Sequence, residues 1–304
     1  ATDAELARDL EQLSGKSIKV DDLTWARRLF ATVLDSPGGL QVQTIHGFCQ
    51  SILRRFPLEA GLSPQFDVLD ERTAKERMRT ARDAVISASK INQLSSVLGP
   101  LNEISERASE STVSELIDDL LSERSKLQTA VRSSDGVNAL CKIIKKELGL
   151  QEDETQIALL NECISFTEFE RAELRIAALA LASGRPTDTK NSLKIIRCLE
   201  IKEPTIKSYH EYLSVFLTQQ DEIRARLATQ EVIKKNEAVF DILNLEAQRV
   251  QKLQKRMKSL DLAIRTEALV KLSYSVLNSY EKTKNINASI DYDDLIFATY
   301  ELLQ

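Results

Sequence analysis

Hydrophobic residues recur along most of the chain at the three- and four-residue spacing of amphipathic helices. The clearest run matches one face of a helix without a miss and consists of Val113, Leu116, Ile117, Leu120 and Leu121. Thr112 and Glu115 have the spacing of a capping box, in which two side chains satisfy backbone amides at a helix N-terminus. We therefore predict a helix that begins at about Thr112.

Glycine and proline divide the remaining helical pattern into segments. Two short helices are predicted before Asp35, and further helices over about residues 72–89, 135–148, 154–182, 190–200 and 206–219. From Glu222 to Tyr280 there is neither Gly nor Pro, which predicts one long helix or two nearly collinear ones. Its expected inward stripe is Leu262, Leu269, Leu272, Val276 and Tyr280.

A different pattern interrupts the helices near residue 40. Leu40–Ile45 alternates apolar and polar residues like a half-buried strand, and His46–Phe56 then has helical spacing. Phe66–Leu69 reads as a second short strand, followed by Asp70 as the cap of a helix that begins at Glu71. Because a two-stranded pairing is marginal in water, we expect the missing partner strands in sequence that this chain does not contain.

Composition supports a mainly α fold. The 304 residues include 9 Gly and 6 Pro, and 5% are aromatic, which suits long helices and excludes collagen-like and disulfide-scaffold proteins. We predict a multi-helix insertion domain with one or two short strands left over from an α/β domain. The net charge of −5 gives no global attraction to nucleic acid, so such a partner has to meet a local basic patch.

The sequence suggests no metal site and no membrane segment. The four cysteines, at 49, 141, 163 and 198, lack CxxC spacing, and there are only two histidines, which fits reduced thiols in a cytosol. No apolar run approaches the roughly 18 residues of a membrane span, so we expect a soluble protein. Asp291, Asp293 and Asp294 resemble a metal cluster, but neighbouring side chains on one element diverge, which disfavours that interpretation.

No catalytic residue is assigned. Gly15-Lys16-Ser17 lacks the earlier glycine of a phosphate-binding loop, because position 10 is Leu10, and a helix-ending glycine is the favoured interpretation. The spacing of His46 and Cys49 suggests a thiol–imidazole pair, yet no orienting partner is identifiable. A buried structural cysteine is the favoured interpretation. We therefore expect no nucleotide hydrolysis and no bound cofactor from these residues alone.

One basic segment is a candidate for phosphate contact. Residues 249–258 carry five cations and no acid, and Arg249, Lys252 and Arg256 fall on one helical face. The alternative is the solvated outer face of a long helix, which this pattern alone favours.

Several motifs carry a family resemblance. Thr44-Ile-His-Gly-Phe-Cys49 resembles the DNA-contact motif of UvrD-like superfamily-one helicases. Gln43–Gln50, Leu53–Gly61 and Phe66–Glu71 together resemble the AddA branch, the helicase–nuclease subunit of bacterial double-strand-break processing. Weaker AddA-like traces are Val215–Thr218, the pair Tyr280 and Lys284, and Ile290–Ile296.

The resemblance implies a position for the chain within a larger motor. Residues 1–70 are expected to be part of motor domain 1A, 71–285 the helical 1B insertion, and 286–304 the return into 1A ahead of Walker B. The P-loop is expected before Ala1, and Walker B, a second motor domain and a nuclease domain after Gln304. The parent is then an ATP-dependent 3′–5′ DNA helicase and nuclease of the bacterial cytoplasm, using ATP and Mg²⁺ with an AddB-like second subunit. The chain alone is expected to be inactive.

The resemblance also implies contacts with single-stranded and fork duplex DNA. The implied residues are Thr44, His46 and Phe48 on the single-strand path, Arg54 and Arg55 at phosphates or simply at the surface, and Arg249, Lys252 and Arg256 near the duplex. Gly47 replaces the serine common in the wider family, so one hydroxyl contact is lost. The alternatives are an ordinary UvrD, PcrA or RecB-like helicase, and a non-enzymatic adaptor that binds a protein along its 222–280 helix.

Overall fold

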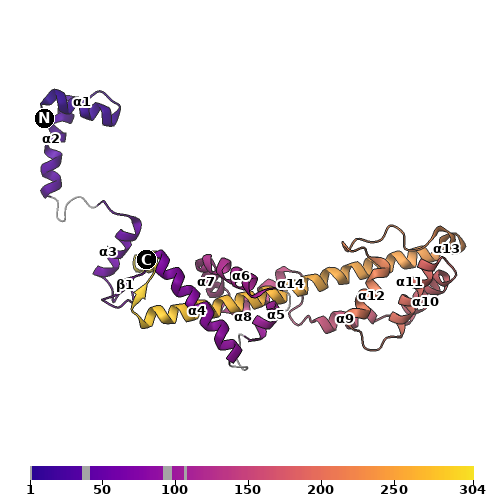
Figure 1. The fold of residues 1–304 in the computed structure, drawn as a ribbon. Coiled ribbons are helices and arrows are strands. Elements are labelled where there is room, and N and C mark those ends of the chain that lie inside the picture. The colour runs from indigo at the N-terminus through magenta and orange to yellow at the C-terminus, as the bar shows by residue number, and fades with distance from the viewer. Residues whose placement is uncertain (1, 36–41, 92–97, 106–107) are drawn as a thin grey trace. The chain divides into compact units, whose positions relative to one another are not determined.

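The computed structural model describes residues 2–35, 42–91, 98–105 and 108–304. It is mainly α-helical, as predicted, and forms two compact units. The first unit consists of Ala1–Ala74 and Lys284–Gln304, and the second unit is Lys75–Thr283. The chain passes between the units within α4 (Glu71–Ile91) and again within α14 (Ala238–Ile286), the long helix of Figure 1.

The first unit combines helices with a small parallel sheet. Its elements are α1 (Asp3–Ser14), α2 (Val20–Asp35), α3 (Ile45–Arg55), β1 (Asp67–Val68), β2 (Ser289–Ile290) and α15 (Tyr292–Leu302). The strands pair in parallel, with Asp67 opposite Ser289 and Val68 opposite Ile290. Helix α15 packs against α3, and the buried core of this unit consists of Cys49, Leu53, Phe66, Ile290 and Leu295. Both short helices predicted before Asp35 are confirmed.

The predicted strand at 40–45 is wrong where it can be compared. Leu40 and Gln41 lie outside the described residues, Val42–Thr44 have no regular structure, and Ile45 opens α3. The alternation ended at a helix cap, which short-range periodicity does not distinguish from a strand end. The second strand is confirmed as β1, and its partner β2 lies in this chain rather than outside it. Asp70 caps α4 as predicted, because its Oδ1 accepts a hydrogen bond from the Thr73 amide at 2.7 Å.

The second unit is built along α14. Figure 1 shows helices α5–α8 along one part of α14 and α9–α13 along the other. Their bounds are α5 Leu98–Ser105, α6 Glu110–Ser122, α7 Arg124–Ser133, α8 Val137–Glu147, α9 Gln156–Ile164, α10 Glu168–Ala182, α11 Pro186–Glu200, α12 Ile206–Phe216 and α13 Gln230–Lys235. Three buried clusters result among the described residues: one around Phe216 and Leu243, one around Ile117, Leu272 and Tyr280, and a small one formed by Leu127, Val131 and Val270.

Several predicted boundaries in this unit need correction. Helix α6 begins at Glu110, because Ser109 is its N-cap and accepts from the Thr112 amide at 3.2 Å, so the capping box at Thr112 is wrong. The predicted helix 154–182 is two helices, since Thr167 caps a new start at α10. Residues 222–229 are not helical, and α14 begins at Ala238. Helices α5 and α7 were not predicted.

The stripe predicted on α14 is largely correct. Leu272, Val276 and Tyr280 are fully buried, and Leu269 is partly buried against the same cluster. Leu262 is wrong, because 53% of it is exposed. A helix of 49 residues passes from one core to another, so its inward face changes along its length.

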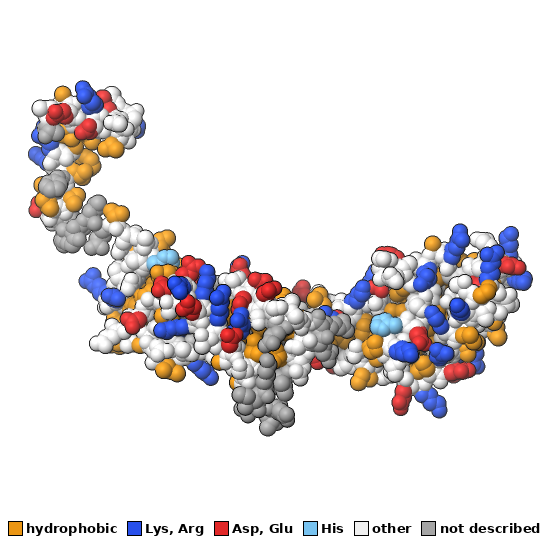
Figure 2. Space-filling view, viewed as in Figure 1, with side chains coloured by type: hydrophobic (Ala, Val, Ile, Leu, Met, Phe, Trp, Pro, Cys, Tyr) orange, Lys and Arg blue, Asp and Glu red, His pale blue; other side chains and the backbone are white. Residues whose placement is uncertain are grey.

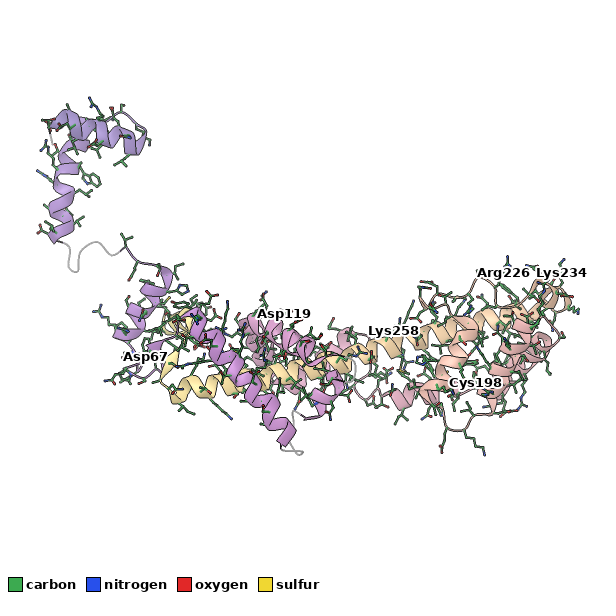
Figure 3. The ribbon with its side chains drawn as sticks, viewed as in Figure 1. Asp67, Asp119, Cys198, Arg226, Lys234 and Lys258 are labelled. Carbon is green, nitrogen blue, oxygen red and sulfur yellow. The ribbon has the colours of Figure 1, made fainter. Side chains whose placement is uncertain are left out.

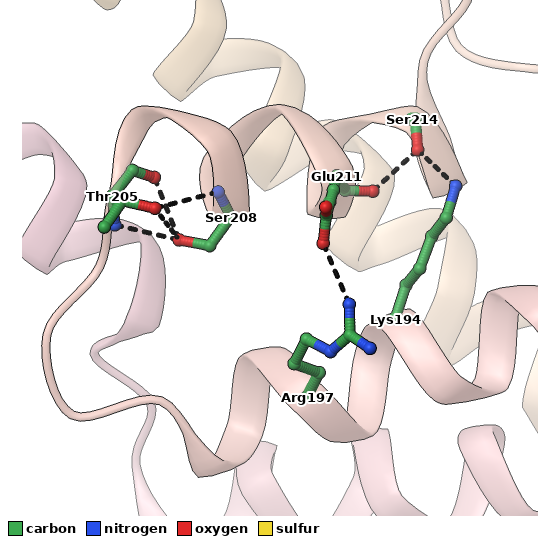
Figure 4. Close-up of polar contacts among 6 residues, drawn as sticks. All are labelled: Lys194, Arg197, Thr205, Ser208, Glu211 and Ser214. Carbon is green, nitrogen blue, oxygen red and sulfur yellow. Dashed lines mark hydrogen bonds and ion pairs between the residues drawn. The ribbon is translucent and has the colours of Figure 1, made fainter.

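Polar contacts join α11 to α12 at their surface. Lys194 Nζ donates to Ser214 Oγ at 2.7 Å, and Arg197 pairs with Glu211 at 3.1 Å (Figure 4). Thr205 caps the start of α12. These contacts orient the two helices, while the apolar cluster beneath supplies most of the stabilisation.

Gly184, just before α11, lies against a buried polar centre. Asp188 is 3% exposed and accepts hydrogen bonds from the Arg185 amide at 3.1 Å and from the Thr229 hydroxyl at 2.7 Å. A Cβ at Gly184 would lie 2.5 Å from Asp188 Oδ2 and 2.7 Å from Val232 Cγ2, so neither neighbour can retreat without losing contacts.

We expect Gly184→Ala to lower the free energy of unfolding by about 1–3 kcal/mol, because the added methyl overpacks this site. Urea denaturation measures the change. The control is Gly99→Ala in α5, where an added Cβ meets no atom within 4 Å. Equal stability of the Gly184 and Gly99 variants would contradict the expectation.

Candidate nucleic-acid interface

The Thr44–Cys49 motif forms the first turn of α3. Thr44 is the N-cap, and its Oγ1 accepts a hydrogen bond from the Gly47 amide at 3.1 Å. Cys49 is buried and free, as the structural interpretation predicted, and it faces the core of the first unit. Phe48 points away from that core and is 48% exposed. Helix α3 therefore packs against the core through Cys49, while the Phe48 ring remains half-exposed.

His46 lies beside an aromatic ring that sequence reasoning did not single out. The ring centroids of His46 and Tyr292 are 4.6 Å apart, and the rings are tilted by 34°. Tyr292 is the first residue of α15 and is 39% exposed. In the sequence, Tyr292 was indicated only as an aromatic residue within Ile290–Ile296, a segment that resembles AddA. The first turns of α3 and α15 thus meet at one surface.

Arg54 and Arg55 lie in the last turn of α3 and are both exposed. At 1.5 Å per residue they are about 12–14 Å from His46 along the helix axis, so the structure does not gather them with His46. The Arg55 guanidinium lies 5.8 Å from the centroid of the Phe56 ring. Cations at a helix C-terminus also complement the helix dipole, which is the purely structural explanation for them.

The position of Gly47 tolerates a side chain. An added Cβ would lie 3.4 Å from Thr44 Oγ1 and 3.6 Å from Gln43 Cβ, which is close to ordinary contact. The serine common in the wider family therefore fits this turn, and the glycine is not required by space.

Arg249 is engaged within the protein. Its Nε and Nη2 donate to the two carboxylate oxygens of Glu246 at 2.8 and 2.7 Å, and Nη2 also donates to the Cys163 carbonyl at 2.9 Å. Its guanidinium lies 4.8 Å from the centroid of the Phe166 ring. Burial disfavours the charged guanidinium and by itself lowers the pKa of Arg249. Its hydrogen bonds to Glu246 and the attraction of that carboxylate are stronger, so the pKa of Arg249 is raised.

Glu246 also joins this network to α12. It is 7% exposed and accepts a hydrogen bond from the Tyr212 hydroxyl at 2.6 Å. Burial, and then the Glu246 charge, raise the pKa of Tyr212 well above its usual value. Arg249 is therefore the countercharge of a buried carboxylate.

Arg256 has two carboxylate partners, Glu154 at 2.8 Å and Glu162 at 2.7 Å. The hydrogen bond to Glu162, more than that to Glu154, raises the pKa of Arg256. Residues 249–258 contain no acid, but acidic side chains lie beside them in the folded chain. The partners of Arg256 come from residues before and within α9. Within the described part of the chain Lys252 forms no ion pair, and it is exposed.

Another cation of residues 249–258 is also paired with an acid. Lys258 projects from α14 (Figure 3) and pairs with Asp221. Figure 2 shows Lys and Arg side chains of the second unit lying among acidic ones on the face in view. The expected DNA contact of the stripe remains a prediction, and Lys252 is its exposed member.

Two of the three aspartates near the end of the chain, Asp291 and Asp294, hold Lys284 and the cap of α15. Asp291 Oδ1 accepts from the amides of Asp293 and Asp294 at 3.1 and 3.2 Å, while Lys284 Nζ lies 3.3 Å from Asp291 Oδ2. Across the described residues no group of three or more His, Cys, Asp or Glu is placed to bind a metal. Gly15 ends α1 with φ of 67°, so Gly15-Lys16-Ser17 does not open a helix as a phosphate-binding loop requires.

Comparison with known proteins identifies the class. The model of the UvrD/REP helicase N-terminal domain matches residues 26–304. This is more than half of the chain, which therefore belongs to the UvrD/REP family of DNA helicases. No curated protein matches it. In the described ranges, no helix is both long enough and apolar enough to cross a bilayer.

Proposed function

We propose that the chain is the helical 1B insertion with flanking parts of motor domain 1A from an AddA-type helicase–nuclease subunit. The family match supports the helicase, and the segments 43–50 and 53–61 support the AddA branch. The parent enzyme would unwind DNA 3′ to 5′ with ATP and Mg²⁺, process double-strand breaks and act with an AddB-like subunit. No segment of this chain reads GxxxxGK[ST], so nucleotide hydrolysis would depend on other residues.

The first unit would contact single-stranded DNA. The observation that carries this proposal is the contact between the His46 and Tyr292 rings, whose centroids are 4.6 Å apart; Phe48, two residues further along α3, adds a half-exposed ring. Aromatic faces accept any base by stacking, which suits a motor that tracks DNA without reading sequence. Thr44 would lie near the sugar–phosphate backbone, with its hydroxyl also holding the helix cap.

The second unit would contact duplex DNA near the fork. Lys252 offers an exposed ammonium on the outer face of α14. Arg249 and Arg256 would add a weaker field there, because carboxylates already neutralise most of their charge. This interface would guide the duplex rather than read its sequence.

The test is the salt dependence with which the 304-residue chain binds fluorescent single-stranded DNA. Replacing Arg54 and Arg55 together by Ala is expected to reduce the slope of log affinity against log salt by roughly 1.4 for single strands, because two phosphate contacts are lost. Fluorescence anisotropy with an oligothymidylate of about 12 nucleotides measures the slope.

The control for this charge change is the pair Arg175→Ala and Arg226→Ala, two exposed arginines of the second unit; Figure 3 labels Arg226. Identical slopes in the two double variants would remove Arg54 and Arg55 from the interface. Failure to bind any DNA at about 50 mM salt, with tight binding of a protein helix instead, would favour the adaptor function.

A further inference from the structure

Lys284 is an almost completely buried lysine. It lies in the last turns of α14 and is 2% exposed. Its Nζ is 2.5 Å from Asp294 Oδ2 and 3.3 Å from Asp291 Oδ2. A buried ammonium costs much solvation energy unless carboxylates compensate it, so this arrangement specifies one position for the side chain.

The same two carboxylates form the N-terminal cap of α15. Asp291 accepts from two amides of the first turn, and Asp294 Oδ2 accepts in return from the Asp291 amide at 2.9 Å. Tyr292 directly follows the cap residue Asp291 and is the first residue of that turn. The position of the Tyr292 ring therefore depends on a cap whose charge Lys284 balances.

The segment before the cap is held by backbone contacts. The Asp67 amide donates to the Ala288 carbonyl at 2.9 Å, and the Leu69 amide donates to the Ile290 carbonyl at 2.8 Å. These bonds fix β2 independently of Lys284, so a change at Lys284 is expected to act on the cap and first turn of α15 rather than on the sheet.

We propose that Lys284 is a positioning residue for the single-strand surface, holding the first turn of α15 so that Tyr292 lies against His46. The DNA part of this inference rests on the proposed function, whereas the ring geometry does not. Without the ammonium, the buried carboxylate of Asp291 faces the partly exposed carboxylate of Asp294, and the two like charges repel. Asp294, which is 31% exposed in its side chain, would turn to solvent and release the Asp291 amide.

The experiment uses the two histidines of the chain as reporters. The Cε1 proton of His46 lies in the ring current of Tyr292, and its reference value without that ring comes from Tyr292→Leu. In Lys284→Met the chemical shift of this proton is expected to move at least halfway from its wild-type value to the value in Tyr292→Leu. His210, in the second unit beside Tyr209, is expected to stay unchanged.

A second variant separates charge from packing. Lys284→Met combined with Asp294→Asn removes one carboxylate charge, while the amide oxygen can still accept from the Asp291 amide. Recovery of the His46 resonance is expected, whereas loss of packing alone gives no recovery. This double variant also carries the test if Lys284→Met does not fold. An unmoved His46 resonance in folded Lys284→Met, or no recovery in the double variant, overturns the proposal.

The DNA measurement distinguishes this proposal from the proposed function. Lys284→Met is expected to weaken oligothymidylate binding by roughly fivefold or more, as Tyr292→Leu does, because the stacking of one base is lost. If His46 moves in Lys284→Met and the affinity does not change, the positioning role in DNA binding is overturned. If Tyr292→Leu and Phe48→Ala also bind normally, the single-strand surface itself is wrong.

Discussion

Replacing Arg249 by Ala is expected to lower the free energy of unfolding by about 3–5 kcal/mol, because it leaves the buried Glu246 carboxylate without its countercharge. The side chain also stacks over Phe166 and donates to the Cys163 carbonyl, and both contacts would be lost. Tyr212 would then be the only described side chain still donating to Glu246.

Urea denaturation followed by circular dichroism measures this loss. Lys252→Ala is the matched control, because it removes the same charge from the same helix three residues later at an exposed position. Its expected effect on stability is within about 0.5 kcal/mol. Similar stabilities for the two variants would show that Glu246 finds another partner and would contradict the network described above. DNA binding by an Arg249 variant is informative only after this measurement.

The basic stripe shows where sequence reasoning fails. Helical spacing correctly placed Arg249 and Arg256 on one helix, because a period of 3.6 residues is a local property. The carboxylate partners of Arg256 are not local, since Glu154 and Glu162 precede it by 102 and 94 residues, whereas Arg249 pairs with Glu246 on the same helix. An acid-free segment therefore became a surface of mixed charge once the chain folded.

Strand prediction succeeded only in part, for a related reason. β1 lies within the predicted strand Phe66–Leu69, but β2 has only two residues, too few to show alternation, and its pairing with β1 joins positions far apart in the sequence. The alternation at Leu40–Ile45 was longer but preceded a helix cap. Burial on α14 was predicted well, since a stripe repeated over several turns averages out local exceptions such as Leu262.

The sequence predicted the α3 residues of the candidate site but not Tyr292. The order of Thr44, His46 and Phe48 at a helix start follows from the motif and the capping preference of threonine. Tyr292 required the tertiary contact between α3 and α15, which no spacing along the chain encodes. The aromatic surface therefore has one more member than the sequence indicated.

That surface gives the second large expected effect. Phe48→Ala combined with Tyr292→Ala is expected to weaken oligothymidylate binding at least about 30-fold, because stacking contributes about 1–3 kcal/mol per base and two rings are lost. Fluorescence anisotropy measures it at fixed salt. Neither ring belongs to the buried core of the first unit, so the fold is expected to remain intact.

Control variants distinguish stacking from a general loss of apolar surface. Phe169→Ala in α10 removes a ring that is 71% exposed in the second unit and is expected to leave single-strand affinity unchanged. Phe48→Trp keeps an aromatic face and is expected to retain binding, whereas Phe48→Leu keeps the apolar volume and is expected to lose it. In the proposed parent enzyme, single-strand-stimulated ATP hydrolysis is expected to fall with Phe48→Ala. Wild-type affinity in the double variant would exclude stacking at this surface. The substitutions leave the phosphate contacts unchanged, so these contacts do not compensate for the loss of two rings.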